Sequence, residues 1–188
     1  MSWHEDRAAW GLAGRLAAIC ALAALLAGCF QPMYGQHSLG SQPSLRTALS
    51  TVAVDQIEAA PNTTEARLAV EVRNQLLFSF TGGESSKAPT HRLTIKLNSK
   101  REKIIVDLQS QRPDMENFGL DASYTLTDLA TGKAVVNGTT FARVSYDIPG
   151  AEQRFARVRG MRDAETRAAK VIADQITARL ASFFIAGT

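Results

Sequence analysis

Five basic side chains in one short segment form the most promising ligand-binding group in the chain. They are Arg92, Lys96, Lys100, Arg101 and Lys103. Guanidinium and ammonium groups near a strand end suit phosphate and carboxylate ligands, because their hydrogen bonds to anions are charge-assisted. The same pattern is typical of an edge strand that charge protects against aggregation. The residues therefore predict either an anion site or a charged edge.

Two other polar groups have simpler explanations. Arg154, Arg157, Arg159 and Arg162 lead into an amphipathic C-terminal segment and are typical of a solvated helix start. Asp114 and Glu116 are close carboxylates, but they follow Pro113, and a turn is the better explanation for them. Neither group by itself predicts a catalytic site.

Motifs for enzymatic chemistry are absent from the sequence. It has no Gly-x-Ser-x-Gly elbow, no His-x-x-x-His, no Cys-x-x-Cys and no glycine-rich phosphate loop. We therefore predict no catalytic residues, no metal site and no cofactor. A lipoprotein hydrolase is disfavoured because the chain lacks a recognisable nucleophile.

The N-terminus has the architecture of a secretory signal. Arg7 and Arg15 precede an apolar run of about 12 residues, which ends in Leu26-Ala27-Gly28-Cys29. A membrane-spanning helix needs about 20 residues, so a transmembrane anchor is the weaker alternative. The last four residues resemble the bacterial lipobox, in which the cysteine is lipidated and becomes the first mature residue. We therefore predict Cys29 as the lipid-attachment site.

This signal predicts the organisation and address of the protein. We expect a signal peptide over 1–28, a lipidated tether over 29–49 and one periplasmic domain over 50–188. Lipidation of Cys29 with three acyl chains, palmitate among them, would hold the protein firmly on a membrane. Under the bacterial sorting rule, Phe30 in place of an aspartate favours the outer membrane. A net charge of +3 and a secreted address argue against nucleic acid as a partner.

Hydrophobic periodicity predicts the elements that must position these residues. Residues 30–49 are predicted to have little regular structure, and residues 51–57 are predicted to form a strand. A helix is predicted to follow, capped by Asn62 or Thr63 and ending at Thr81. Residues 91–109 alternate, but the polar run 98–103 leaves open whether they form one bent strand or two halves with a bulge. Residues 118–126 form the clearest strand, followed by a turn at 128–133 and a return strand over 134–146, with Gly138 as a candidate bulge.

The last segment has the pattern of a helix. Its apolar stripe comprises Ala168, Ile172, Ile176, Leu180 and Phe183, and most of its charges, Glu165 among them, are expected on the other face. The order of elements predicts an α+β domain with two helices packed on one face of a four-stranded, mostly antiparallel sheet. A helical crossover could make the first strand parallel to a later one.

The chain as a whole resembles the LptE family of lipopolysaccharide-assembly lipoproteins. The resemblance rests on the lipobox followed by Phe30-Gln31-Pro32-Met33-Tyr34-Gly35, the strand Tyr124-Thr125-Leu126, the turn Thr131-Gly132, the return Asn137-Gly138-Thr139, Ser145-Tyr146-Asp147 and the closing helix. It covers residues 26–184. The glycine that follows the cysteine in that family is missing here, where Phe30 stands.

The resemblance implies a specific function. It implies that the domain assists assembly of LptD, a large outer-membrane β-barrel, plugs its lumen and helps deliver lipopolysaccharide to the outer leaflet. In that setting, the five basic residues around Lys96 would face lipopolysaccharide. The alternative is an auxiliary lipoprotein of another lipid-trafficking system, such as an mce-type transporter.

Overall fold

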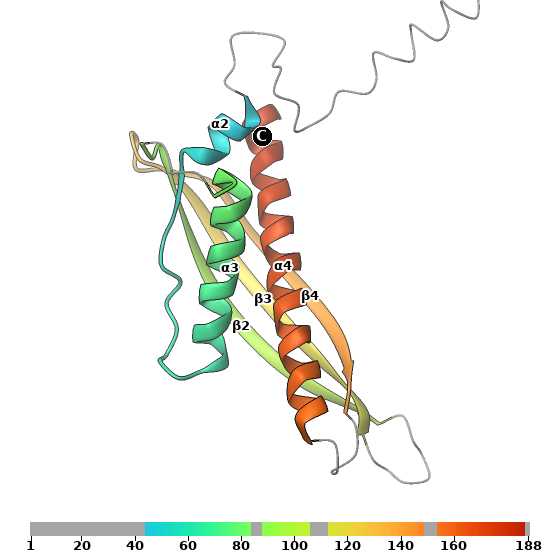
Figure 1. Ribbon diagram of the computed structural model, residues 1–188. Helices are drawn as coiled ribbons and strands as arrows, with labels where there is room; N and C mark the ends of the chain where they lie inside the picture. The colour runs from blue at the N-terminus through green and yellow to red at the C-terminus, as the bar shows by residue number, and fades with distance from the viewer. Residues whose placement is uncertain (1–43, 84–87, 106–112, 149–153, 187–188) are drawn as a thin grey trace, which may run out of the picture. The chain divides into compact units, whose positions relative to one another are not determined.

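The structure, a computed structural model, describes residues 44–83, 88–105, 113–148 and 154–186. Its strands are β1 (Val52–Val54), β2 (His91–Ile105), β3 (Pro113–Asp128) and β4 (Ala134–Asp147). Its helices are α2 (Leu45–Ser50), α3 (Thr64–Thr81) and α4 (Arg154–Ala186). All of them belong to one unit spanning Pro43–Thr188 (Figure 1).

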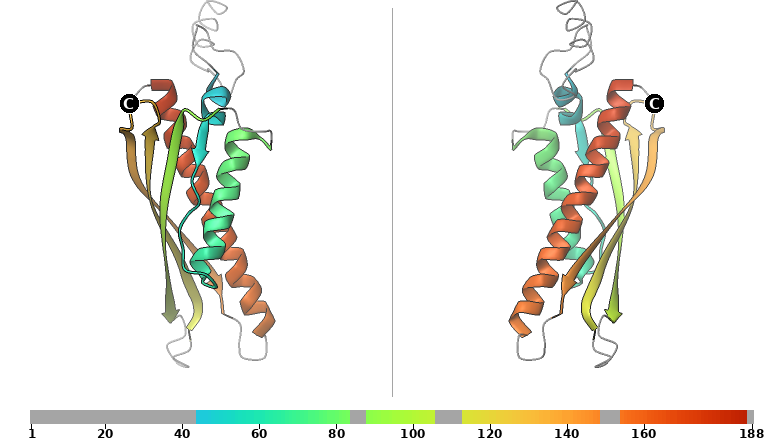
Figure 2. Two further views of the ribbon diagram at one scale, coloured as in Figure 1. Left: turned by 90° about the vertical axis from the view of Figure 1, so that its left-hand side faces the viewer. Right: turned by 90° about the vertical axis from the view of Figure 1, so that its right-hand side faces the viewer.

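The sheet has the strand order β1-β2-β3-β4. β1 pairs in parallel with β2, so α3 is the crossover between them, and the other two pairings are antiparallel. Both long helices lie on the same side of the sheet (Figure 2). The predicted α+β fold, with two helices on one face of a mostly antiparallel sheet, is confirmed.

Local signals place α3 where the sequence predicts it. The Thr63 hydroxyl accepts a hydrogen bond from the Ala66 N–H at 3.2 Å, which caps the first turn. The helix ends at Gly82, whose φ of 65° lies in the left-handed region that glycine adopts without strain. Its buried face consists of Leu68, Ala69, Val72, Leu76 and Phe80.

The polar run 98–103 does not interrupt the sheet. β2 pairs with β3 from His91 opposite Asp128 to Ile104 opposite Met115, and the register shifts only between Ile104 and Ile105. Of the two alternatives, one long strand is therefore correct over residues 91–105, whereas residues 106–109 lie outside the described residues. The backbone ladder continues through residues 98–103 because alternate side chains there still face the helices.

Two expectations were wrong. Residues 45–49 were expected to be irregular, but they belong to α2, whose Leu45 and Leu49 are buried against α3 and α4. Gly138 is not at a bulge, since the register of the β3–β4 pair shifts between Leu126 and Thr127 instead. A Cβ at Gly138 would lie 2.5 Å from the Tyr124 hydroxyl oxygen, so glycine makes room for that side chain.

The core lies between the sheet and the two long helices. Leu93, Phe118, Leu120 and Leu126 of the sheet and Ile172, Ile176 and Leu180 of α4 are completely buried. Small side chains on α4 allow it to approach its neighbours closely: Ala164, Ala168, Ala169 and Ala173. Among the described residues, no helix has the length and apolar character needed to cross a membrane.

Candidate functional site

The five basic residues lie on two different faces of β2. Side chains alternate along a strand, and residues directly opposite on neighbouring strands share a face. Lys96 lies opposite Ser123 and Lys100 opposite Gly119, on the face that α3 and α4 leave uncovered, and Arg92 has the same parity. Arg101 lies opposite the buried Phe118, and Lys103 opposite the buried Glu116, so both belong to the helix-covered face.

We call the uncovered side of β2, β3 and β4 the open face. Arg92, Lys96 and Lys100 form a row on it about 27 Å long, since each residue adds about 3.4 Å. The Arg92 guanidinium lies 3.6 Å from the Asp55 carboxylate, which offsets part of its charge. Within the described part of the chain, no ion pair involves Lys96 or Lys100, and both are exposed. These two lysines are therefore the cations best placed to meet an anion.

The open face is hollowed beside Lys96. One hollow of about 370 Å³ is lined by Lys96, Asn98, Asp121, Ser123, Thr139 and Phe141, among others. A second, of about 500 Å³, is lined by Thr94, Lys96, Ser123, Thr125, Asn137 and Thr139, among others. The two share Lys96, Ser123 and Thr139. They form a shallow trough across three strands, whose lining combines hydroxyl and amide groups with the Asp121 carboxylate and the Phe141 ring, and Lys96 contributes the one ammonium group of this lining.

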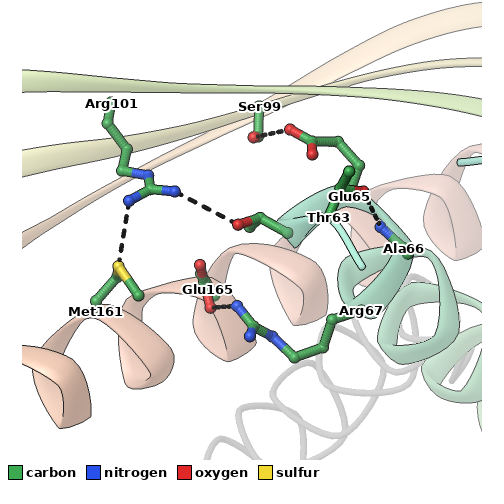
Figure 3. A network of polar contacts seen from close by, with 9 residues as sticks. Thr63, Glu65, Ala66, Arg67, Ser99, Arg101, Met161 and Glu165 are labelled. Atoms are coloured by element: carbon green, nitrogen blue, oxygen red, sulfur yellow. Dashed lines mark hydrogen bonds and ion pairs between the residues drawn. The ribbon is translucent and has the colours of Figure 1, made fainter. Parts of the chain in front are cut away.

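Arg101 takes part in a joint between β2 and the helices instead. Its guanidinium donates to the Thr64 hydroxyl and to the Met161 sulfur, each at 3.4 Å (Figure 3). On the same strand face, the Ser99 hydroxyl donates to the Glu65 carboxylate at 2.5 Å. This hydrogen bond is the main reason why the pKa of Glu65 is lowered. Arg101 thus fixes the start of α3, although it remains partly available to solvent.

A buried carboxylate links α3 to α4 nearby. The Glu165 side chain is 3% exposed, and one of its oxygens accepts a hydrogen bond from Arg67 (Figure 3). Its other oxygen has no hydrogen-bond partner in the structure. Glu165 was expected on the polar face of its helix, which is wrong. Its spacing of three and four residues from Ala168 and Ala169 places it on the buried stripe.

We expect Arg67→Met to lower the free energy of unfolding by about 3 kcal/mol, because it strands a buried carboxylate. Methionine keeps most of the apolar stem, so lost packing contributes little. Chemical denaturation measures the effect. Adding Glu165→Gln should restore most of the stability, and a double variant no more stable than Arg67→Met would contradict the role of this pair. The neighbouring pair Arg167 and Asp163 is a matched control, since both side chains are exposed and Arg167→Met should change stability little.

A second buried carboxylate corrects the expectation of a turn at residues 114–116. These residues are part of β3, and Glu116 is 5% exposed on its helix-covered face. The Tyr146 hydroxyl of β4 donates to the Glu116 carboxylate at 2.5 Å, and the Arg157 guanidinium of α4 lies 3.9 Å from the same oxygen. Glu116 therefore joins two strands to the first turns of α4.

This environment gives a pH prediction. Burial, followed by the hydrogen bond to Glu116, raises the pKa of Tyr146 to about 12 from 10.0. Because the folded-state pKa lies above the unfolded one, the stabilisation is complete below pH 10 and is lost as pH rises from 10 to 12. We expect unfolding free energy to fall over this window by on the order of 2 kcal/mol. Denaturation at several pH values should show a shallower fall for Tyr146→Phe; an unchanged fall would contradict the assignment.

The described residues do not assemble a catalytic or metal centre. No group of three or more His, Cys, Asp or Glu side chains in those residues could hold a metal ion. Tyr146 and Arg157 contact the Glu116 carboxylate, and Arg67 contacts the Glu165 carboxylate. Each of these contacts joins two elements of the fold. The trough and the lysine row suit binding, whereas the two carboxylates suit structural roles.

A family model of known proteins matches the folded domain. The family model LptE, described as lipopolysaccharide-assembly, matches residues 49–180, which is well over half of the chain. The chain belongs to the LptE family. The match runs from the end of α2 to Leu180 in α4, so it includes the whole sheet and the lysine row. The family is concerned with lipopolysaccharide assembly and is not a family of enzymes.

Solved structures share the LptE fold. A protein from Caulobacter crescentus CB15, described as a lipoprotein, is 21% identical, with 77% of this chain and 97% of that chain covered and a TM-score of 0.60. Rare lipoprotein B from Shewanella oneidensis is 14% identical, with 72% of this chain and 95% of that chain covered and a TM-score of 0.50. No curated protein matches the chain. At these identities, the two structures support the fold alone.

Proposed function

We propose that this LptE-family protein is an outer-membrane lipoprotein that assists assembly of an LptD barrel and plugs its lumen. The observation that carries the proposal is the family match over the folded domain. A rigid two-layer domain with long strands and a polar open face suits insertion into a water-filled barrel, whose lumen is also polar. The protein would act by binding and positioning, without enzymatic activity.

The proposed address follows from the N-terminus. Cys29 would carry the lipid, the residues after it would form the tether, and the domain would lie on the periplasmic face of the outer membrane. Cys29 and residues 30–43 lie outside the described residues. The domain that receives the tether begins with α2, whose buried leucines would fix the end of the tether to the core.

The experiment that tests this function is purification of the outer-membrane complex. A tag at the C-terminus allows the protein to be isolated from detergent-solubilised membranes. We expect a large β-barrel protein to be recovered with it. Recovery of the subunits of a lipid transporter in place of a barrel would favour the mce-type alternative, which the family match does not support.

We also propose that the open face contacts lipopolysaccharide through Lys96 and Lys100. Both cations are exposed, and Lys96 lines the trough while Lys100 lies four residues along the same face of β2; Arg92, by contrast, is paired with Asp55. Arg101 and Lys103, on the other face, would contribute less. Lipopolysaccharide offers phosphate groups for the cations and sugar hydroxyls for the Ser, Thr and Asn side chains between them.

The prediction is that Lys96→Ser with Lys100→Ser weakens lipopolysaccharide binding by about tenfold, because two charge-assisted contacts are lost. The remaining binding should depend less on salt. Binding can be measured by fluorescence titration with the purified full chain in detergent, and circular dichroism checks the fold. Lys103→Ser with Lys133→Ser is the matched control, with the same loss of two charges from exposed side chains. Equal effects from both pairs would show that the net charge matters and the face does not.

A further inference from the structure

The trough on the open face is built from two sets of residues that lie opposite one another across β2, β3 and β4. Within a set, directly opposite side chains have Cβ atoms about 5 Å apart, and the two sets are about 7 Å apart along the strands. Side chains of very different chemistry therefore gather in a small area. The two sets are Lys96, Ser123 and Thr139, and Asn98, Asp121 and Phe141.

Arg143 fixes the end of the trough that contains Asp121 and Phe141. Its guanidinium donates to one oxygen of Asp121 at 2.8 Å and to the main-chain oxygen of Ala142 at 3.0 Å. The guanidinium carbon also lies 5.3 Å from the centroid of the Phe141 ring. Gly119 lies opposite Arg143, and a Cβ there would be 3.2 Å from its side chain, so glycine leaves room for it. Because these side chains are already restrained, little of their freedom would be lost on binding a ligand.

Phe141 gives the trough an apolar surface among polar groups. It is 64% exposed, although Arg143 lies against its ring. The ring lines the same hollow of about 370 Å³ as Lys96 and Asp121. The face of an aromatic ring carries a negative potential, so it attracts ligand groups with a partial positive charge, such as C–H groups. Phe141 therefore suits a ligand that has one apolar face and polar edges.

The mixture of groups limits the chemistry of the ligand. An acyl chain would leave Lys96 and Asp121 without partners, which costs free energy. A bare phosphate would satisfy Lys96 but would be repelled by Asp121, whose carboxylate needs a hydrogen-bond donor. A sugar offers hydroxyl groups to Asp121, Ser123 and Thr139, and a C–H face to Phe141. A negatively charged substituent on that sugar would satisfy Lys96.

We propose that the trough is a subsite for an anionic saccharide. One sugar ring packs on Phe141, its hydroxyls donate to Asp121, and its carboxylate or phosphate group binds Lys96. This inference rests on the proposed contact with lipopolysaccharide and deepens it, because it assigns the sugars of that ligand to the trough and excludes its acyl chains from it. Recognition then depends on the hydroxyls and the ring as well as on charge.

Calorimetric titration with deacylated lipopolysaccharide tests the proposal on the purified full chain in detergent. This probe keeps the sugars and phosphates and lacks the acyl chains. We expect binding that Phe141→Ala weakens by about tenfold, because packing against the ring is lost. Phe155→Ala is the matched control, since Phe155 is 86% exposed on α4 and its loss should leave binding unchanged. Equal effects of the two variants, with the fold checked by circular dichroism, would overturn the proposal.

The variant Asp121→Asn separates a saccharide subsite from a merely electrostatic one. If the trough only attracts anions, removing this carboxylate beside Lys96 strengthens binding of the probe, because a repulsive charge is lost. If Asp121 accepts hydrogen bonds from sugar hydroxyls, binding weakens by about fivefold, since charge-assisted hydrogen bonds are replaced by neutral ones. We expect weaker binding, and tighter binding would overturn the proposal.

The charged group of the sugar is identified by repeating the titration of Lys96→Ser with a probe treated with phosphatase. An effect of Lys96→Ser that disappears with the phosphates assigns a phosphate to Lys96, whereas an effect that persists assigns a carboxylate. No effect of Lys96→Ser on either probe would overturn the proposal.

The proposed function and the saccharide subsite can fail separately. Absence of binding to deacylated lipopolysaccharide overturns the subsite, and a chain that still binds intact lipopolysaccharide would then recognise it through another part. Co-purification of a barrel does not depend on that result, because the titrations contain no barrel. Failure to recover a barrel would contradict the proposed function and leave the measured saccharide binding unchanged.

Discussion

Leu126→Ala and Ile176→Ala are each expected to lower the free energy of unfolding by about 2–5 kcal/mol, the range for removing a buried branched side chain. Leu126 lies on β3 and Ile176 on α4, and both are completely buried where the sheet meets the helix. Each truncation removes apolar contacts and leaves a cavity that two regular elements cannot easily close. Urea denaturation, followed by far-UV circular dichroism, measures both losses.

The control for this prediction is the residue next to Leu126. Thr125 points to the open face, where its hydroxyl donates to Asn137 at 2.9 Å. Thr125→Ala should therefore change stability by only about 1 kcal/mol or less, since one partly exposed hydrogen bond is lost. Losses of the same size at Thr125 and Leu126 would contradict the assigned faces of β3.

Cys29→Ala is expected to have the largest effect on the location of the protein. If Cys29 carries the lipid, the variant should accumulate as an uncleaved precursor and should not reach the outer membrane. The physical reason is the anchor: each acyl CH₂ in a membrane contributes about 0.8 kcal/mol, so three chains hold the protein permanently. Membrane fractionation and the electrophoretic mobility of the mature and precursor forms measure the outcome.

Two further variants make this test specific. Cys20→Ala changes the other cysteine of the chain, which lies in the apolar run, and it should be processed normally. Phe30→Asp should leave processing intact but shift the protein towards the inner membrane. Normal processing and outer-membrane attachment of the Cys29→Ala variant would rule out Cys29 as the lipid-attachment site.

The elements themselves were largely predictable from local patterns. Apolar residues four apart predicted α3 and α4, because that spacing defines one helix face. Strict alternation predicted the centre of β3, and the polar turn before Ala134 predicted the hairpin. α2 was missed because a six-residue helix has too little periodicity to detect, and so short a helix depends on tertiary packing for its stability.

Which basic residues lie on the open face and which on the helix-covered face could be known only once β2 was shown to be continuous. Leu93, Ile95 and Leu97 indicate which parity faces the core, and the same parity extends to Arg101 and Lys103. A bulge in the run 98–103 would have reversed that assignment, since a shift of one residue moves each later side chain to the other face. Pairing with β3 decides the matter.

The sequence by itself determined the class of fold, the order of its strands and two long helices, and most of the apolar residues of its core, because each depends on patterns within a few residues. The tertiary structure alone decided which distant polar groups meet. Glu165 is 98 residues from Arg67, and Glu116 is 30 from Tyr146. It also decided that β4 lies at an edge, since strand order depends on how the whole chain packs. Contacts between distant residues are selected by burial and hydrogen bonding in the assembled core, which no local pattern encodes.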